Sequence, residues 1–294
     1  MIENPYIEFK KQRELGDVLS DTFAFMRSQF KTFFPVFFKI VGPYLLLMVI
    51  ALVFYLYYVG DQFNFMIQNQ NFEGMDMLTI FGLASFYFVT LLLVYALSQS
   101  TVLHYVKSYT AGKGEIDFQA IRSDVYASLP SFVGLIFLVA ISLIVGLVIC
   151  CFPMIYLWVP LSLAFGIMVF EKKGAITAYG DSFRLVKDEW WITFATMVVV
   201  TIIVAIAGYA FALPTTMYNY AKMGILSGEV DAESMMEIFK DPIYILLNVV
   251  SSIAQFMLNI ITLVAGAFIY FNLNEKKNFT GTNERIQNLG QRPE

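Results

Sequence analysis

The stretch SFVGLIFLVAISLIVGLVI, residues 131–149, contains no charged residue and is apolar almost throughout. A helix of about 20 apolar residues crosses the roughly 30 Å hydrocarbon core of a bilayer. The apolar residues are continuous and do not alternate with polar ones, which favours a helix over a strand of a membrane barrel. This stretch therefore predicts a transmembrane helix.

Five further stretches have the same character, and none of the six contains Asp, Glu, Lys or Arg. The predicted spans are about 40–59, 78–103, 131–149, 154–170, 190–213 and 243–271. The composition agrees, because 58% of the 294 residues are hydrophobic and only 14% are charged, against roughly 25% in soluble domains. The predicted fold class is an all-α polytopic membrane protein, with a six-helix membrane domain over residues 40–274.

The basic residues are divided unevenly between the two sides of these spans. With six spans, 17 of the 19 Lys and Arg residues lie on the side of the termini, and only Lys222 and Lys240 lie on the other. Positively charged loops stay in the cytoplasm, so we expect both the N-terminal segment 1–39 and the tail 275–294 to be cytoplasmic. The part of the tail after Lys277 is polar and short, and we expect it to be disordered. No cleavable signal peptide is recognisable in residues 1–39, and we expect a bacterial cytoplasmic (inner) membrane.

An amphipathic stretch precedes each of spans one, three and five. The apolar residues of each stretch recur at helical spacing, with charged residues on the opposite side. The three stretches lie at about 15–31, 117–129 and 176–190. Such segments predict three amphipathic helices that lie in the cytoplasmic membrane interface.

Two of these stretches match each other without gaps: DTFAFMRSQF, residues 21–30, and DSFRLVKDEW, residues 181–190. The shared motif residues are Asp21, Phe23, Arg27 and Phe30 in one copy and Asp181, Phe183, Lys187 and Trp190 in the other. The middle stretch lacks this motif. The pattern favours three repeated units of interfacial helix plus helical hairpin. Convergence is the alternative, since an acidic start, a basic end and an interfacial aromatic suit any such helix.

The segments GDVLSDTFAFMRSQFKTFFPVFF, residues 16–38, and AITAYGDSFRLVKDEWWITFATMVVV, residues 175–200, resemble a known membrane domain. It is the one found with bacterial glycerophosphoryl diester phosphodiesterases and in related uncharacterised six-span inner-membrane proteins. The family name implies phosphodiester hydrolysis, but that activity belongs to a separate soluble barrel domain. The longest predicted non-spanning segment here, about 40 residues, is too short for such a domain. The resemblance therefore carries over no catalytic residue.

Span six carries polar residues at steps of three and four, which places them on one face of a helix. They are Asn248, Ser252, Gln255, Asn259 and Thr262, followed by Gly266. Lipid penalises such side chains, so we expect this face to turn into the helix bundle. There it would either hydrogen-bond between helices or line a path for a substrate.

Span two offers a possible partner for that face in a polar cluster near its end. The cluster contains Ser98, Gln99, Thr101 and His104. His104 is the only histidine in the chain and could titrate near neutral pH. A structural hydrogen bond is the commoner role for a lone interfacial histidine.

The residue inventory excludes several functions. Energy-coupled carriers and proton relays usually place ionisable groups within the membrane, and the predicted spans contain no acidic or basic side chain. One histidine and two adjacent cysteines offer neither a metal site nor a catalytic set. A net charge of −4 provides no basic surface for nucleic acid.

We therefore predict a non-catalytic protein that needs no cofactor or metal and binds no nucleic acid. Its expected partners are membrane lipids or other inner-membrane proteins, for which it would act as a scaffold or accessory subunit. The alternative is a transporter or permease-like component that moves a small or lipidic substrate along the polar face of span six.

Overall fold

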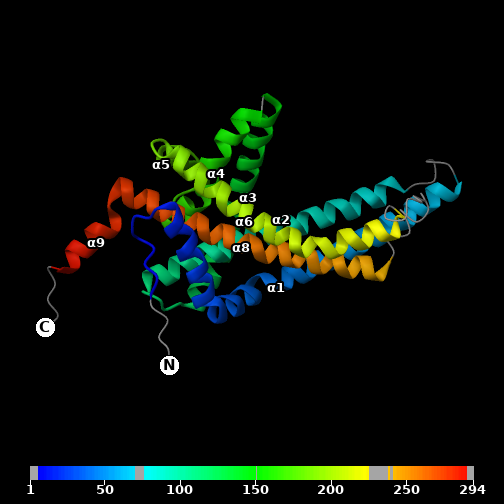
Figure 1. Ribbon diagram of the computed structural model, residues 1–294, viewed down its shortest axis with the longest axis horizontal. Helices are drawn as coiled ribbons and strands as arrows, with labels where there is room; N and C mark the ends of the chain where they lie inside the picture. Colours follow the sequence, from blue (N-terminus) through cyan, green and yellow to red (C-terminus); the bar gives the residue numbers. More distant parts are fainter. Residues whose placement is uncertain (1–5, 70–75, 150, 225–237, 239–240, 290–294) are drawn as a thin grey trace. The chain divides into compact units, whose positions relative to one another are not determined.

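The computed structural model describes residues 6–69, 76–149, 151–224, 238 and 241–289, and these are mostly helical (Figure 1). The helices are α1 (Leu15–Asn69), α2 (Met77–Ala111), α3 (Phe118–Ile149), α4 (Cys151–Phe170), α5 (Ala175–Val186), α6 (Trp190–Lys222), α8 (Pro242–Asn278) and α9 (Thr280–Leu289). No strand occurs in the described ranges. The predicted all-α class is confirmed.

Six of these helices are long and apolar enough to cross a membrane, as the sequence predicts. They are α1, α2, α3, α4, α6 and α8, and each contains one predicted span. Several run well beyond the apolar stretch, because the backbone hydrogen bonds of a helix do not require apolar side chains. The boundary expected between residues 39 and 40 consequently lies inside α1.

Only one of the three predicted amphipathic stretches forms a helix of its own. The third is α5, whereas the first and second are the N-terminal parts of α1 and α3. Pro130 lies inside α3, and neighbouring groups can compensate for the one hydrogen bond that a proline removes. Between α5 and α6, the three charged residues Lys187–Glu189 form a turn, in which the Glu189 N–H donates to the Val186 carbonyl at 2.9 Å. The third stretch thus ends before its span, as predicted, whereas the first two continue into their spans without a break and differ from the prediction of separate helices.

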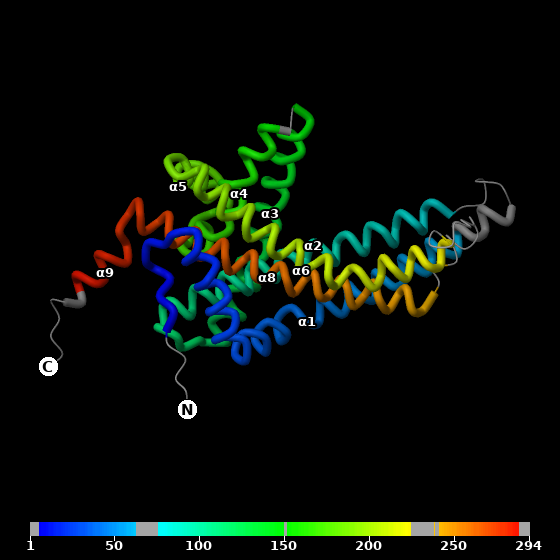
Figure 2. Tube along the Cα trace, in the orientation of Figure 1, coloured from blue at the N-terminus to red at the C-terminus, as the bar shows by residue number. Residues whose placement is uncertain are grey.

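The chain divides into two compact units. Unit 1 comprises Met1–Ile40, Ala96–Ile203 and Ile260–Glu294, and unit 2 comprises Val41–Tyr95 and Val204–Asn259. The helices α1, α2, α6 and α8 each contribute residues to both units. Each unit is thus assembled from segments that lie far apart in the sequence, as the colours along the trace show (Figure 2).

In unit 1, α3 and α4 form a hairpin against which α5 packs (Figure 1). The two arms of the hairpin approach closely at Gly146, where an added Cβ would lie 3.1 Å from the backbone nitrogen of Met154. The Ser142 hydroxyl of α3 lies 3.0 Å from the Tyr179 hydroxyl of α5. A small residue thus allows α3 and α4 to approach closely, and a polar contact links α3 to α5.

Beyond Lys277 the tail is mostly helical as far as Leu289, which corrects the expectation that this part of the chain is disordered. The carboxylate of Glu275, buried near the end of α8, accepts the N–H groups of Gly281 at 2.6 Å and Thr282 at 2.9 Å. These N–H groups belong to the first turn of α9, which a carboxylate caps favourably. A Cβ on Gly281 would overlap the carbonyl oxygen of Lys10, so the tail also packs against the N-terminal segment.

Unit 2 contains two helix pairs that are defined by aromatic and polar contacts. The rings of Tyr55 in α1 and Tyr87 in α2 stack with their centroids 6.1 Å apart. Between α6 and α8, Tyr218 donates to Asp241 at 2.7 Å, and Lys222 pairs with the same carboxylate at 3.2 Å. The charged groups of the second pair gather at the ends of their helices, outside the apolar stretches.

Candidate functional site

Three helices of unit 1 begin in the same register relative to an aspartate. Each starts six residues before that aspartate, which is Asp21 in α1, Asp124 in α3 and Asp181 in α5. The positions three residues before and one residue after it are buried in every copy: Val18 and Thr22, Ile121 and Val125, Ala178 and Ser182. The middle stretch, which lacks the sequence motif, therefore shares the register. This agreement supports the internal repeat.

In each copy, the aspartate pairs with a base that lies outside its own helix. Arg13 contacts Asp21 at 2.9 Å and Lys173 contacts Asp181 at 2.6 Å, and in both copies the base stands eight residues before the acid. Asp124 instead takes its base from another helix, Lys107 of α2, at 2.8 Å. The pair fixes the start of each helix to the chain that precedes it or packs beside it.

The Arg13 side chain is completely buried. Besides Asp21, its guanidinium donates to the backbone carbonyl groups of Phe9 at 2.7 Å, Lys11 at 3.2 Å and Glu8. Burial lowers the pKa of the guanidinium, and the hydrogen bond to Asp21 opposes that shift. An arginine remains charged in such surroundings, so this buried cation organises the N-terminal segment around itself.

The same segment is held by aromatic contacts with α8. Phe9 is fully buried and stacks on Phe268 with a centroid separation of 4.1 Å. The guanidinium of Arg13 lies 4.6 Å from the centre of the Phe268 ring, within the range of a cation–π interaction. The backbone N–H of Arg13 donates to Asn272 Oδ1 at 2.7 Å. The chain before α1 is therefore part of the core of unit 1.

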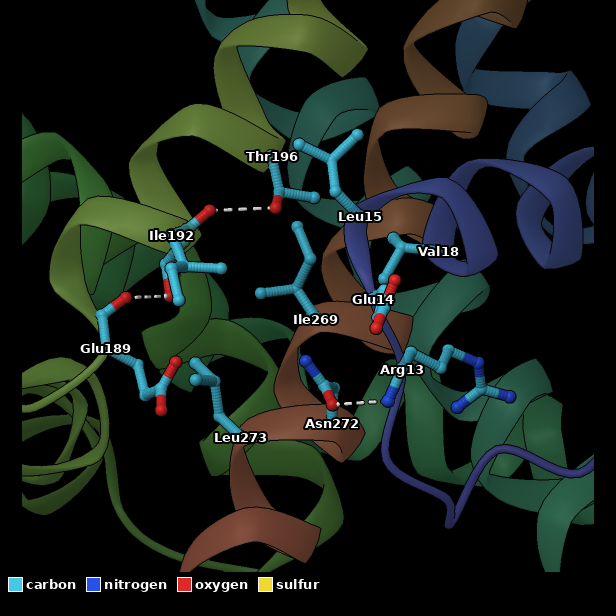
Figure 3. A pocket seen from close by; sticks show the side chains of 11 residues that line it. Arg13, Glu14, Leu15, Val18, Glu189, Ile192, Thr196, Ile269, Asn272 and Leu273 are labelled. Atoms are coloured by element: carbon cyan, nitrogen blue, oxygen red, sulfur yellow. Dashed lines mark hydrogen bonds between the residues drawn. The ribbon is translucent and has the colours of Figure 1, made fainter.

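Figure 3 shows a small cavity beside this cluster, between the start of α1, the start of α6 and α8. Arg13, Asn272, Glu189 and Thr193 are among the residues that line it. Its volume is about 10 Å³, which is room for a single water molecule. The cavity is too small to be a substrate site, so the cluster is structural.

The base of the third copy is more accessible than Arg13. The Lys173 ammonium contacts both Asp181 and Glu171 at 2.6 Å, with 36% of its side chain exposed. The hydrogen bond from Lys173 lowers the pKa of the Asp181 carboxyl, and the same bond raises the pKa of Lys173. Arg184 adds a second base to Asp181. This copy is held by a surface ion-pair network.

The first copy exposes a stripe that we call the basic–aromatic face. It consists of Phe23, Arg27, Phe30, Lys31 and Phe38, all exposed and all on one side of α1. Neither Arg27 nor Lys31 forms an ion pair with any residue that the structure describes. Cations flanked by exposed aromatic rings are typical of a membrane interface.

The remaining motif residues of the third copy have matching positions. Lys187 is exposed like Arg27. Trp190 stacks on Phe194 at 5.1 Å, as Phe30 contacts Phe34 at 4.5 Å. Phe183 lies against Tyr179 within its own helix, with the ring centroids 5.4 Å apart. The base and the aromatic pair of the motif are therefore common to both copies.

The span-two cluster lies in unit 1 and is buried. Nδ1 of His104 lies 2.8 Å from the Ser100 carbonyl oxygen of its own helix, and the Ser100 hydroxyl lies 3.0 Å from that of Ser128 in α3. Thr101 donates to the Leu97 carbonyl at 2.7 Å.

Two atoms of the cluster, Ser98 Oγ and Gln99 Oε1, are buried and have no partner among the described residues. The bonds of His104 and Thr101 lie within α2, and the contact between Ser100 and Ser128 joins α2 to α3. This geometry supports a structural role for His104.

The polar face of span six is divided between the units, with Asn248, Ser252, Gln255 and Asn259 in unit 2 and Thr262 in unit 1. Gln255 is exposed and the other four are half-buried, and the inward orientation of this face stays a prediction. Gln255 Nε2 donates to Ser251 Oγ at 3.3 Å, and Asn248 Nδ2 donates to the Tyr244 carbonyl at 3.4 Å. Both bonds lie within α8. The partnership with span two stays a prediction.

Sequence reasoning missed the residues around which the first copy is organised, namely Phe9, Arg13 and Asn272. One pattern could have found Arg13, since it stands eight residues before Asp21 as Lys173 stands before Asp181. Phe9 and Asn272 carry no comparable pattern. Their role depends on the contact of the N-terminal segment with α8, which joins residues 259 positions apart.

Within the described residues, no group of three or more His, Cys, Asp or Glu side chains is placed to hold a metal ion. The class that the fold defines is an all-helical protein with six helices able to cross a membrane. No family model, curated protein or solved structure matches the chain. The resemblance to the phosphodiesterase-associated membrane domain therefore stays a prediction from its motifs.

Proposed function

We propose that the protein is a non-catalytic scaffold of the bacterial inner membrane, with both termini in the cytoplasm. In this role the basic–aromatic face of α1 binds the headgroups of anionic phospholipids in the cytoplasmic leaflet. The position of the face agrees with this orientation, because it lies on the N-terminal part of α1, on the side that the distribution of Lys and Arg assigns to the cytoplasm.

The observation that carries the proposal is the contrast between paired and unpaired cations in unit 1. Arg13, Lys107 and Lys173 all contact carboxylates. Arg27 and Lys31 contact none in the described part of the chain, and Phe23 and Phe30 beside them are 43% and 58% exposed. A surface with free cations and apolar rings matches a phosphate headgroup above an acyl chain.

The lipid is held in place and is not transformed in this proposal. The cavity beside Arg13 has a volume of about 10 Å³, which is too small to admit a lipid. A scaffold needs only a lasting contact, which charge and apolar area supply.

The test is the double variant Arg27→Gln/Lys31→Gln in nanodiscs that contain a small fraction of fluorescent phosphatidylglycerol. Each cation near an anionic surface contributes about 1 kcal/mol, so we expect affinity to fall about 30-fold. Lys113→Gln removes one exposed base from a turn with no exposed aromatic stripe beside it, and its loss is the control for the loss per charge in the double variant.

An equal loss in the control would show that the effect is general charge attraction. Unchanged binding in the double variant would refute the proposal, as would turnover of a phospholipid by the purified protein. Enrichment of phosphatidylcholine as strong as that of phosphatidylglycerol would also contradict it, because the zwitterionic headgroup has no net charge to attract the two cations.

A further inference from the structure

Unit 2 has an open groove between α6 and α8, which run beside each other there (Figure 1). The groove has a volume of about 310 Å³ and is lined by Ala205, Gly208, Tyr209, Ala212, Gln255 and Leu258, among others. It is hollow because the α6 side presents small residues. A Cβ added at Gly208 would lie 3.9 Å from its nearest neighbouring atoms, which belong to Gln255 and Leu258.

The groove lies within the apolar part of both helices. Tyr209 is 13 residues from Lys222, and Gln255 is 14 residues from Asp241, the two charged groups that pair at the helix ends. At 1.5 Å per residue these distances are about 20 Å. In a hydrocarbon core about 30 Å thick, both side chains lie away from water.

Two polar groups on this face lack partners for part of their hydrogen-bonding capacity. The Tyr209 side chain is 73% exposed, and its hydroxyl has no partner among the described residues. Gln255 is also exposed; its amide nitrogen donates to Ser251, while its carbonyl oxygen accepts no bond from the described residues. Lipid tails can satisfy neither group. One face at hydrocarbon depth thus carries a free donor next to a free acceptor.

We propose that a second copy of this chain covers the groove in a two-fold dimer. The Tyr209 ring of each copy enters the groove of the other, and its hydroxyl donates to Oε1 of the partner's Gln255. A two-fold interface brings the same patch of both molecules together. This patch contains both the groove and the ring that would enter it, and both the hydroxyl donor of Tyr209 and the carbonyl acceptor of Gln255. Small residues on α6 allow the close helix approach on which association in membranes depends.

Other occupants match the face less completely. An acyl chain fills the volume but leaves Tyr209 and Gln255 unpaired. A different transmembrane helix would need its own acceptor for Tyr209 and its own donor for Gln255, whereas a second copy contains both by identity. This inference goes beyond the proposed lipid contact, which concerns unit 1 and different residues.

The test measures the mass of the purified full chain in mild detergent and in nanodiscs over a range of protein concentrations. Gly208→Leu fills the groove, and we expect it to be monomeric where the natural chain is dimeric. Gly82→Leu is the matched control: Gly82 is an exposed residue of α2 in unit 2 with no atom within 4 Å of its Cβ position. We expect this variant to dimerise normally.

A second variant keeps the test decisive if Gly208→Leu fails to fold. Tyr209→Phe preserves the shape of the ring and removes only the hydroxyl, once in each copy, so we expect the dimer dissociation constant to rise about tenfold. The proposal is overturned if the natural chain is monomeric in both environments. It is equally overturned if Tyr209→Phe and Gly208→Leu dimerise like the control, or if the groove retains lipid on a monomer.

Discussion

The first and third copies of the repeat share an ion pair near the start of the helix, but they bury its base to different degrees. In both, a base eight residues upstream pairs with the aspartate near the start of the helix. In the first copy, the Arg13 side chain is fully buried, whereas 36% of the Lys173 side chain in the third copy is exposed. The first helix continues into a span, and the third ends in a turn before α6.

This difference shows what the surroundings add to a shared motif. Arginine has five N–H donors in a planar arrangement, which suits several carbonyl acceptors at once, whereas a lysine ammonium is a compact charge that suits a surface. The first copy can therefore bury its base and attach the N-terminal segment to α8. The third copy keeps its base at the surface, and its helix is held mainly by packing against α3 and α4.

The largest effect should come from removing the two bases. We expect Arg13→Met to lower the free energy of unfolding by about 3–5 kcal/mol, because it leaves several buried carbonyl groups without a donor and leaves Asp21 with Lys11 as its remaining base. Lys173→Met should cost no more than about 1 kcal/mol, since a partly exposed pair contributes little. Denaturant titration of both variants in the same mixed micelles measures the difference. Equal losses would mean that burial does not distinguish the two copies.

Helix continuity can be tested at a matched pair of positions. Ser28 in the interior of α1 and Asp188 in the turn before α6 correspond in the repeat alignment. Ser28→Pro should cost about 3 kcal/mol, because a proline in a helix interior removes a hydrogen bond and clashes with the preceding turn. Asp188→Pro should cost clearly less, because no helix runs through that residue. Circular dichroism and thermal unfolding are the readouts, and a reversed order would show that α1 is broken near Ser28.

The smallest effect concerns pH and the third copy. The pKa of Asp181 is lowered in the folded protein by its bond from Lys173, so its contribution to stability is present above the unfolded pKa of about 3.9 and is lost as the pH falls below that value. We expect Asp181→Asn to be slightly less stable than the natural chain at pH 6. The gap should close toward pH 3. A gap that stays constant across this range would mean that the charge of Asp181 contributes nothing.

The same comparison shows which features could be predicted from residues alone. The six spans follow from long runs without charge, and a run of that length has few alternatives in a membrane. The motif shared by residues 21–30 and 181–190 was also visible. The register of the middle copy was not, because Asp124 is followed by Val125 in place of a hydroxyl residue. The structure reveals this register because Val125 is buried at the same position as Thr22 and Ser182 in the other two copies.

Sequence by itself determined the number of apolar helices and the positions of the basic and aromatic motif residues, because both depend on local runs and spacing. Tertiary structure alone decided that Phe9 and Arg13 belong to the core, that Glu275 caps α9, and that Gln255 is exposed beside a groove. Each of these depends on a contact, or on its absence, between segments far apart in the chain. Hydrophobicity and spacing along one segment carry no information about which distant segment will cover it.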